Sequence, residues 1–495
     1  MRSVTTDGYN EYWRGAETDG ARVILTRAQK LRYAFYAGIL VLSILWDYKI
    51  AFTVLTFAWC GFYSAAIGYK MLCVGLSLLK RPEIRLTPEA LRAAADAELP
   101  TYTILVPLYH EANVVGGIVR AISQLHYPPE KLDVKFLIEA DDTETAAACS
   151  AASLPSYCEI LVVPQGTPRT KPRACNVGIE NTRGKFLVVY DAEDRPEPDQ
   201  LRKAEAAFAG LPTHVACLQC KLNYYNADQN VLTRFFTLEY TVWFDLFLPG
   251  LHALKAPIPL GGTSNHFRIE VLRQLHGWDP FNVTEDCDLG VRLAREGYRT
   301  MVLDSTTWEE ANSRLWNWVR QRSRWVKGYI QTHCVYTREP GDLSRHYGLW
   351  GGVSFLLTVG GLSATLLWNP FCWLMVVLWL FLRWKLLYFD FTDETMQSYT
   401  LWSKLSWVFF GATVALFLAN FLFIVMNLMG CFRRRLWRLI PYALLSPFYW
   451  VLISFGAWKG FLQLLYKPFY WEKTLHGFHP EGTDDAPPAP VKEAV

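Results

Sequence analysis

The 495-residue sequence lacks the features that define several common classes of protein. Lys and Arg number 49 against 46 Asp and Glu, so the net charge of +3 gives no reason to expect nucleic-acid binding. No histidine pair, Ser-His-Asp arrangement or phosphate-binding Walker loop is present. The eleven cysteines contain one C-x-x-C, Cys217 and Cys220, so we expect no zinc site. The first thirty residues are polar, and we expect no cleavable signal peptide.

Apolar and aromatic residues are abundant instead. Hydrophobic residues make up 51% of the chain, with 20 Trp, 25 Tyr and 29 Phe, as in proteins that carry aromatic belts at membrane interfaces. Residues 33–46 and 50–79 are two apolar stretches separated by Asp47-Tyr48-Lys49. Because a membrane span needs about 20 apolar residues, they predict a helical hairpin. Four further spans are predicted, with a break at Asn369-Pro370 between the first two: 347–367, 371–387, 401–429 and 440–466.

These segments divide the chain into five parts. We expect an N-terminal segment (1–30), two transmembrane helices (31–80), a soluble domain (81–345), about four transmembrane helices (346–467) and a tail (468–495). The tail is rich in Pro and Ala from Asp484 onwards, which is typical of disorder.

The positive charges beside the spans give a partly contradictory orientation. Arg22, Arg27, Lys30 and Arg32 favour a cytoplasmic N-terminus, and two spans then leave the soluble domain in the cytoplasm. The same count puts a C-terminal arginine run outside, against the positive-inside rule: Arg433, Arg434, Arg435 and Arg438. Either one C-terminal span is miscounted or the N-terminal signal dominates. We expect a multi-pass protein of the inner (plasma) membrane with a cytoplasmic domain.

The soluble region alternates between strand and helix patterns. Short apolar strands are predicted over 102–107, 134–138, 160–163 and 186–190, and a helix over 113–125. This alternation predicts a mostly parallel, Rossmann-like α/β sheet. Ligands of such sheets bind beyond the carboxyl ends of the strands.

Acidic residues follow two of these strands. Asp191, Glu193 and Asp194 come directly after the strand 186–190 and could share a hard cation such as Mg²⁺, which takes phosphate oxygens as further ligands. The alternative is an ordinary acidic turn. Asp141 and Asp142 follow the strand 134–138, where they could accept hydrogen bonds from a nucleobase or cap the next helix.

Further candidate site residues lie in three short segments. Thr284 is placed to cap a helix whose first turn holds Glu285 and Asp286, and an ionised carboxylate there can act as a general base. Two acids that simply complement the helix dipole are the alternative. Lys171 could reach a phosphate or stay solvated. The Gly-rich stretch 260–266 permits close approach of its backbone to a ligand, or is a plain turn.

The stretch 320–325 is the most informative one in the chain. Gln321, Arg324 and Trp325 are spaced i, i+3 and i+4, so a helix over about 312–330 puts them on one face. The guanidinium group forks onto phosphate oxygens, and the indole stacks on the apolar face of a sugar ring. The alternative is an interfacial helix anchored to lipid headgroups, because another face is apolar: Leu315, Trp318, Val319, Val326 and Tyr329.

The order of these motifs resembles the membrane-embedded members of glycosyltransferase family 2, the group that holds cellulose, hyaluronan and chitin synthases. The resemblance covers about residues 101–325, the flanking apolar segments and residues 468–477. Residues 321–325 match the family's Q-(Q/R)-x-R-W signature, and Thr284-Glu285-Asp286 match its T-E-D. The resemblance implies a glycosyltransferase-A type α/β domain inserted between two and about four transmembrane helices.

The resemblance also implies roles for individual residues. Asp141 would bind the base, Lys171 would approach the diphosphate, and the donor would contact seven residues in all: Tyr109, Glu111, Asp141, Lys171, Asp191, Gln321 and Arg324. Mg²⁺ or Mn²⁺ would be held by Asp191 with either Glu193 or Asp194. Asp286, flanked by Thr284 and Glu285, would be the catalytic base. The acceptor sugar would contact Trp325, Gly262, Thr263 and Ser264.

The sequence departs from the family pattern in two places. The family's D-x-D reads Asp-Ala-Glu-Asp at 191–194, so either Glu193 or Asp194 could be the second metal ligand. The F-x-V-T-x-K gating loop of cellulose synthases is not found, although residues 471–474 (Trp-Glu-Lys-Thr) offer a Thr and a Lys near the membrane surface. No cyclic-dinucleotide-binding domain is recognisable.

The resemblance implies an inverting, processive polysaccharide synthase that takes sugar from a nucleotide-sugar, with a β-glucan from UDP-glucose as first guess. The expected partners are the growing polysaccharide, the lipid bilayer and export proteins. Transfer of one sugar to a polyprenyl phosphate or another lipid is the alternative within enzymes. A non-catalytic sugar-binding membrane subunit is the alternative of another class.

Overall fold

A nine-stranded sheet forms the centre of the α/β domain. The structure is a computed structural model that describes residues 2–3, 8–16, 19–92, 96–339, 341–388, 393–474 and 477–478. The strands lie in the order β1-β4-β3-β2-β5-β8-β7-β9-β6. Their bounds are β1 (Arg2–Ser3), β2 (Tyr102–Leu108), β3 (Leu132–Glu139), β4 (Cys158–Val163), β5 (Phe186–Val189), β6 (Arg195–Pro196), β7 (Val215–Tyr224), β8 (Asn265–Arg268) and β9 (Arg299–Glu309).

Five strand pairs of this sheet are parallel and three are antiparallel. The pairs β1–β4, β4–β3, β3–β2, β2–β5 and β7–β9 are parallel. The short strand β8 runs antiparallel between β5 and β7, and β6 pairs antiparallel with β9. The prediction of a mostly parallel α/β sheet is confirmed, and the central antiparallel strand makes it a mixed one.

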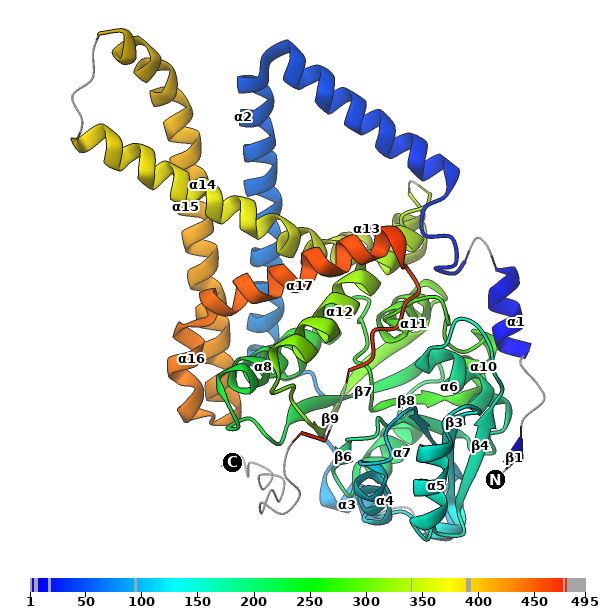
Figure 1. Cartoon of the computed structure of the whole chain (residues 1–495). Coiled ribbons are helices and arrows are strands. Elements are labelled where there is room, and N and C mark those ends of the chain that lie inside the picture. Colours follow the sequence, from blue (N-terminus) through cyan, green and yellow to red (C-terminus); the bar gives the residue numbers. More distant parts are fainter. Residues whose placement is uncertain are drawn as a thin grey trace.

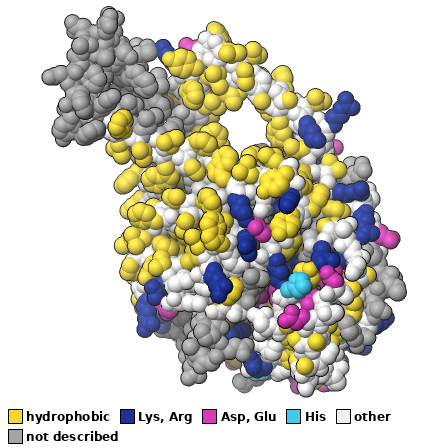
Figure 2. Space-filling view, in the orientation of Figure 1, with side chains coloured by type: hydrophobic (Ala, Val, Ile, Leu, Met, Phe, Trp, Pro, Cys, Tyr) yellow, Lys and Arg dark blue, Asp and Glu magenta, His cyan; other side chains and the backbone are white. Residues whose placement is uncertain are grey.

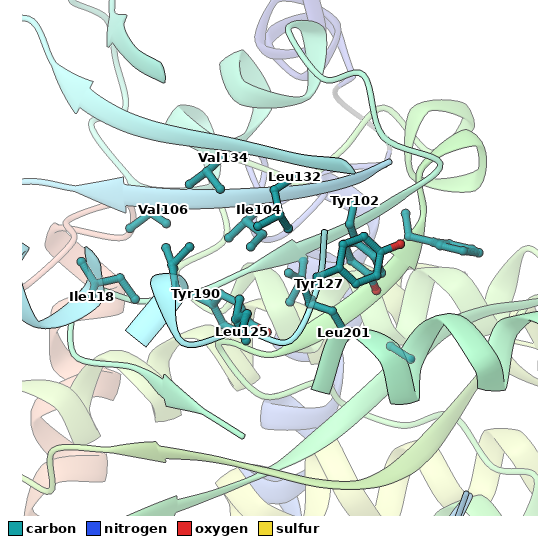
Figure 3. Packing of buried hydrophobic residues seen from close by; sticks show 14 of the residues in the cluster. Tyr102, Ile104, Val106, Ile118, Leu125, Tyr127, Leu132, Val134, Tyr190 and Leu201 are labelled. Carbon is teal, nitrogen blue, oxygen red and sulfur yellow. The ribbon is translucent and has the colours of Figure 1, made fainter. Parts of the chain in front are cut away.

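Helices cover both faces of the sheet because its strands are apolar on both faces. Ile104 and Val106 of β2 belong to one buried cluster, shown in Figure 3, whereas Leu105 between them belongs to the cluster on the opposite face. The same alternation explains the lone C-x-x-C. Cys217 and Cys220 of β7 are buried free thiols in these two different clusters, so they cannot form a joint metal site.

The helices of the domain occupy the connections between strands (Figure 1). They are α1 (Gly8–Gly15), α3 (Pro88–Arg92), η1 (Asp96–Glu98), α4 (Val115–Ser123), η2 (Pro129–Lys131), α5 (Thr143–Ala151), α6 (Lys171–Glu180), α7 (Gln200–Gly210), α8 (Val231–Val242), η3 (Trp243–Phe247), α9 (Leu248–Leu254), α10 (Ile269–Gln274), α11 (Glu285–Arg295) and α12 (Leu315–Tyr336). The helix predicted over about 312–330 is α12.

The N-terminal apolar region forms α2 (Arg27–Lys80), which is bent at Asp47. Asp47 has non-helical backbone angles (φ −152°, ψ 99°), and its carboxylate accepts hydrogen bonds from the backbone N–H groups of Lys49 and Ile50. Figure 1 shows the two arms diverging from this bend. The arms correspond to the two predicted N-terminal segments.

The C-terminal apolar region forms α13 (Asp342–Phe355), η4 (Leu356–Gly360), α14 (Gly361–Tyr388), α15 (Asp393–Arg434), η5 (Trp437–Leu439), α16 (Ile440–Leu444) and α17 (Ser446–Tyr466). The break predicted at Asn369-Pro370 is not observed, because α14 continues through Pro370. Membrane helices tolerate proline where neighbouring groups satisfy the freed carbonyl.

Four helices of the described residues are long and apolar enough to cross a membrane: Arg27–Lys80, Asp342–Leu374, Phe417–Arg434 and Ser446–Tyr466. Figure 2 shows hydrophobic side chains gathered over the long helices, with charged side chains more frequent over the α/β domain. Trp46, Leu79 and Phe417 are 92%, 84% and 70% exposed. An apolar surface of this extent is typical of contact with lipid.

Ion pairs place the C-terminal arginine run beside the α/β domain. Arg433 pairs with Glu83, at 3.0 Å, just beyond the end of α2. Arg434 pairs with Asp245 of η3 at 2.5 Å. These arginines therefore lie on the same side of any membrane as the domain, and the conflict with the positive-inside rule disappears.

The last long helix, α17, begins and ends on the α/β domain. The hydroxyl of Tyr449 donates a hydrogen bond to Glu239 of α8 near the start of α17. Beyond its end, Lys327 of α12 donates one to the carbonyl of Tyr470. Figure 1 shows α17 packed along α12. Although its length and composition match a span, α17 lies along the domain surface.

Two glycines allow this packing. A Cβ at Gly456 would lie 2.9 Å from the Cβ of Arg322, and one at Gly460 would lie 2.3 Å from the carbonyl oxygen of Ser323. The pattern G-x-x-x-G is a known means of bringing two helix backbones close together. The contact falls on the stretch 321–325, so α17 fixes the part of α12 that carries the candidate site residues.

We predict that Gly460→Ala lowers the stability of the protein, because the added methyl group forces α17 away from α12. Overpacking of this kind costs about 1–3 kcal/mol. The measurement is thermal unfolding in detergent. Gly61→Ala is the matched control, since a Cβ at this helical glycine meets nothing within 4 Å. Equal melting temperatures of the two variants would contradict the close-packing role.

Candidate active site

A cavity of about 820 Å³ connects the carboxyl ends of the sheet strands with the long helices. Its domain end is lined by residues that follow β2 and β5, including Tyr109 and Asp191. Its other end is lined by α2, α14, α15 and α17, including Tyr63, Asn369 and Phe423. Most of the predicted site residues line this cavity, as parallel α/β sheets lead one to expect.

Lys171, Asp191 and Gly262 form one corner of the cavity. Lys171 is the first residue of α6, and its ammonium group pairs with the Asp191 carboxylate and donates to the Gly262 carbonyl at 2.7 Å. Burial lowers the pKa of Lys171, but the carboxylates of Asp191 and Glu285 outweigh this and raise it. The lysine is therefore a fixed positive charge at the cavity wall.

The three acids after β5 have different positions. Asp191 and Glu193 line the cavity. Asp194 is fully buried outside the lining, where it accepts hydrogen bonds from the Asp191 backbone N–H, at 2.8 Å, and from the Thr263 hydroxyl. Of the two alternatives for the second metal ligand, the placement favours Glu193. Asp194 holds the turn that presents the other two acids.

The predicted acceptor loop is only partly exposed to the cavity. Gly262 and Thr263 line it, but Ser264 does not. Ser264 is fully buried, and its hydroxyl donates to Thr307 of β9 at 2.6 Å. The structure gives no support to a direct acceptor contact by Ser264, because its side chain joins β8 to β9 instead.

Glu285 and Asp286 face the cavity from the first turn of α11. Burial raises the pKa of Glu285 to about 8, and the neighbouring Asp286 carboxylate adds to this, while Lys171 and Arg324 oppose it. Burial also raises the pKa of Asp286, against hydrogen bonding from the Cys287 backbone N–H. Two neighbouring carboxylates with raised pKa values in one cavity are typical of acid–base sites.

Thr284 occupies the predicted N-cap position of α11, but its side chain makes no capping hydrogen bond. It packs instead against Gly328 of α12, where a Cβ would lie 2.2 Å from the Thr284 hydroxyl oxygen. The contact joins the start of α11 to α12. Thr284 therefore sets the distance between the candidate base and the helix opposite.

Gln321, Arg324 and Trp325 all line the cavity from one face of α12, as the spacing predicts. Gln321 accepts a hydrogen bond from the Asn312 amide at 3.0 Å. The Trp325 ring stacks near Tyr240 of α8, with 6.0 Å between ring centres. Arg324 lies over another tryptophan, Trp471, at 4.4 Å.

Arg322 has a role that sequence reasoning missed. Both arms of its guanidinium group pair with Glu239, and Tyr449 donates to the same carboxylate at 2.9 Å. The guanidinium carbon also lies 4.6 Å from the centre of the Trp325 ring. Arg322 thus joins α12, α8 and α17 and supports the tryptophan of the signature. The match of Arg322 to the second position of Q-(Q/R)-x-R-W was the available signal, but a sequence signature does not show that Glu239 is its partner.

The predicted nucleotide pocket is formed by Tyr109 and Glu111 after β2, with Asp141 after β3. Tyr109 and Glu111 line the cavity. Asp141 lies at its edge, where Arg169 bridges it to Tyr109 with contacts of 2.7 Å to each side chain. Arg169 was not predicted. Asp142 caps α5 by accepting from the Thr145 backbone N–H, which is the structural role considered for it.

The segment after α17 returns to the cavity. Trp471, Lys473 and Thr474 line it opposite the sheet, and Lys473 lies 3.4 Å from Glu111. The sequence offered the Thr and Lys of this segment only as a replacement for the missing gating loop. The position of these two residues could not be derived from the sequence, because Lys473 contacts Glu111, which lies 362 positions earlier in the chain.

The far end of the cavity combines aromatic and polar side chains from the long helices. Lys70, the one charged residue between positions 50 and 79, lines it and lies over Phe423 at 5.1 Å. Trp450 of α17 and polar groups of α14, α15 and α17 complete it: Thr365, Asn369, Asn427 and Ser446. Tyr63 of α2 also lines the cavity. It lies 17 residues before the end of this helix at Lys80, which corresponds to about 25 Å of helix.

Four aromatic residues of the C-terminal apolar region are candidates from the sequence to line a path through the helices: Trp350, Trp368, Trp407 and Phe410. Trp350 is 82% exposed and Trp368 50% exposed, and neither they nor Phe410 line the cavity. The side chain of Trp407 lies outside the described residues.

The carboxylates at the domain end fit a divalent cation bound together with phosphate. Among the residues with described placement, no three Asp, Glu, His or Cys side chains form a preformed metal cage. Mg²⁺ usually takes one or two carboxylates plus phosphate oxygens and water, so Asp191 and Glu193 suffice. The charge balance agrees: Lys171 and Arg324 face a larger set of acids, Asp191, Glu193, Glu285, Asp286 and Glu309. Burial and the carboxylates of Asp194, Glu193 and Asp191 raise the pKa of Glu309, as expected where negative charge is in excess.

Comparison with known proteins gives the domain a family. Residues 100–328 match the family described as "Glycosyltransferase like family 2". This part of the chain is a glycosyltransferase family 2 domain with the glycosyltransferase-A type fold.

Three curated relatives illustrate the range of the match. The "Probable glycosyltransferase YdaM" of Bacillus subtilis is 28% identical over 238 residues, 47% of this chain and 56% of the relative. The "Beta-monoglucosyldiacylglycerol synthase" of Synechocystis is 24% identical over 67% of this chain and 66% of the relative. The "Probable glucomannan 4-beta-mannosyltransferase 7" of Oryza sativa is 23% identical over 62% and 55%. The chain thus matches between about half and two thirds of their lengths.

We predict that Glu193→Ala and Asp194→Ala have different effects. Glu193→Ala should weaken Mn²⁺-dependent binding of UDP or GDP and leave the melting temperature near that of the wild type. Asp194→Ala removes the acceptor of two buried donors and should lower stability, since an unsatisfied buried group costs about 1–3 kcal/mol. Calorimetric titration and thermal unfolding separate the two effects. The reverse pattern would indicate that Asp194, and not Glu193, is the second metal ligand.

Proposed function

We propose that this glycosyltransferase is an inverting, processive polysaccharide synthase that uses a nucleotide-sugar and passes its product between its own membrane helices. The observation that carries the proposal is the cavity itself. It is one continuous cavity that extends from the acidic residues beyond the sheet strands to the aromatic and polar side chains of the long helices. A growing chain bound there would remain attached after each transfer.

The donor end has the groups that a nucleotide diphosphate needs. Lys171 and Arg324 supply positive charge from opposite walls, and Tyr109 and Arg169 offer an aromatic face and a hydrogen-bonding edge for the base. Mg²⁺ or Mn²⁺ held by Asp191 and Glu193 would supply a Lewis acid for the phosphate oxygens. UDP-glucose is our first choice of donor, and GDP-mannose is the second to test, because the relatives are named for glucosyl and mannosyl products.

The reaction assigned to the site is a single displacement. The acceptor hydroxyl oxygen attacks the anomeric carbon, its proton passes to Asp286, and the bond from carbon to the diphosphate oxygen breaks. The electron pair of that bond stays on the diphosphate, whose charge Arg324 and Lys171 balance. Attack from the side opposite the leaving group inverts the anomeric centre.

The acceptor end fits a sugar chain. Trp325 lies where the domain end meets the helices, and Trp450 and Tyr449 continue the aromatic wall towards Asn427. Aromatic faces stack on pyranose rings, and amide groups bond their hydroxyls. The proposed setting is the inner membrane, with the domain in the cytoplasm, where nucleotide-sugars are made. Export proteins are possible partners.

Transfer to a lipid is the second candidate, favoured by one observation. Parts of the far lining are aliphatic or thioether side chains, such as Val74, Leu366 and Met426, which also suit an acyl chain. The name of the Synechocystis relative refers to a glycolipid product.

The deciding experiment is the size of the product. Purified protein in nanodiscs receives radiolabelled UDP-glucose or GDP-mannose with Mn²⁺, and the products are separated by gel filtration and by solvent extraction. A high-molecular-mass product supports the polysaccharide synthase. Label confined to the lipid extract supports the second candidate. No transfer and no hydrolysis from any nucleotide-sugar of a wider panel would contradict both.

We predict that Asp286→Asn lowers turnover by roughly 10²–10⁴-fold and leaves donor binding intact, because the amide keeps the size but cannot accept the proton. Turnover is followed by release of the nucleoside diphosphate, and binding by calorimetry. Full activity of Asp286→Asn would show that Asp286 is not the catalytic base.

The pH dependence gives an independent check. The pKa of Asp286 is raised, so activity should fall, as pH is lowered, at a higher pH than an ordinary aspartate would cause. Burial raises the pKa of Glu285 to about 8, so Glu285 is already protonated where Asp286 titrates, and Glu285→Gln should leave this acid limb in place. The profile of kcat/KM against pH measures the position of the limb. A limb that moves to lower pH in Glu285→Gln would show that Glu285, and not Asp286, is the group that titrates.

A further inference from the structure

The segment after α17 lies across the mouth of the cavity; we refer to residues 468–474 as the C-terminal strap. Figure 1 shows this segment descending from the end of α17 beside α12 and α11. Gln331 and Lys327 of α12 donate hydrogen bonds to the carbonyls of Pro468 and Tyr470, at 3.3 and 2.8 Å. Phe469 packs edge-on against Phe281. The strap therefore has a defined path over the domain.

Glu472 is the most strongly held residue of the strap. Its carboxylate accepts hydrogen bonds from Lys459 at 2.7 and 2.6 Å, from Gln463 at 2.9 Å and from Ser323 at 3.2 Å. Lys459 and Gln463 are four residues apart on α17, so one turn of this apolar helix presents both donors on the same face. Ser323 belongs to the signature stretch of α12. Glu472 thus joins three elements at one point.

The residues on either side of Glu472 point the other way, into the cavity. Trp471 lies under the Arg324 guanidinium, at 4.4 Å from the ring centre. Lys473 pairs with Glu111 at 3.4 Å and lies 5.4 Å from the centre of the Tyr109 ring. Neighbouring side chains of an extended chain point to opposite sides. Because Glu472 is fixed on the outside, its two neighbours must face the donor end.

Some donor atoms of this region still lack acceptors. Among the residues that the structure describes, Thr474 Oγ1 and Arg324 Nε are buried without a hydrogen-bond partner, and Lys473 Nζ has the Glu111 carboxylate at 3.4 Å as its ion-pair partner. Buried donors are rarely left without an acceptor in a finished site. All three side chains line the cavity beside the candidate diphosphate position.

We infer that Glu472, held by Lys459 and Gln463, is a positioning residue that fixes the strap so that Trp471 and Lys473 complete the donor site. The inference rests on the proposed nucleotide-sugar chemistry. Glu472 acts through its neighbours and does not touch the donor. Its effect depends on the register of the strap: a slip by one residue turns Trp471 and Lys473 out of the cavity and Glu472 into it, where its charge repels a diphosphate.

Donor binding tests the inference with UDP and GDP, each with Mn²⁺, as calorimetric probes of the full-length protein in detergent. Glu472→Ala and Lys459→Met should each weaken binding at least tenfold. Lys459→Arg keeps a cation opposite Glu472 and should restore binding to near the wild-type value. Asp228→Asn, a change in an exposed carboxylate whose side chain is 62% exposed, is the control for charge removal.

A double substitution separates positioning from plain stabilisation. If Glu472 acts through Lys473, then Lys473→Met should weaken binding in the wild type but add little in the Glu472→Ala background. Full additivity of the two losses would overturn the inference, and so would unchanged binding in Lys459→Met. Equal failure of Lys459→Met and Lys459→Arg, with melting temperatures below that of the wild type, would reduce Glu472 to a structural tie and also overturn it. If wild-type protein binds neither nucleotide, the proposed function fails first, which is a distinguishable result.

Discussion

The pair of Arg322 and Glu239 is the interaction on which the arrangement of the candidate active site depends. The Arg322 side chain is buried, whereas the Glu239 side chain is 34% exposed. A charge removed from water is tolerated only with a well-placed partner, so the position of Arg322 depends on that of Glu239. Arg322 is on α12 and Glu239 is on α8, and Tyr449 of α17 donates to the same carboxylate. Three helices from distant parts of the chain are thereby aligned. The pair fixes geometry rather than adding much stability, since its Coulomb gain is offset by desolvation.

Charge also explains how the same cavity serves two chemically different ends. At the domain end the acids exceed the lysine and arginine side chains, and this excess of negative charge suits a divalent cation. Towards the long helices the lining combines aromatic, aliphatic, amide and hydroxyl side chains, with Lys70 as a charged member. In the proposed synthase the donor would be held by charge and the acceptor by stacking and hydrogen bonds. A product chain would slide along the second kind of wall, because no single contact there is strong.

Sequence reasoning predicted the parts of this site that are local and missed those that are not. Gln321, Arg324 and Trp325 fall on one face of α12 because helical spacing dictates it, and Asp191 and Glu193 reach the cavity because they follow a parallel strand. Asp194 and Ser264 are polar residues next to Glu193 and Thr263, which line the cavity. Their own side chains turn into the domain instead, and only their hydrogen-bond partners in the structure reveal this. The Arg322–Glu239 pair joins positions 83 residues apart. Likewise, hydropathy counts α17 as a span, whereas contacts at both its ends keep it on the domain.

The position of α17 links the membrane helices to the donor site. Its two glycines press it against the signature stretch of α12, Tyr449 reaches the Arg322–Glu239 pair, and its last turns hold the carboxylate of Glu472. Any displacement of α17 relative to α12 must therefore move the strap and the wall of the acceptor path together. An enzyme that repeats the same transfer on a chain it does not release needs such a link, because the donor pocket must be rebuilt each time the product advances. In the proposed polysaccharide synthase, the packing of α17 along α12 would supply that link.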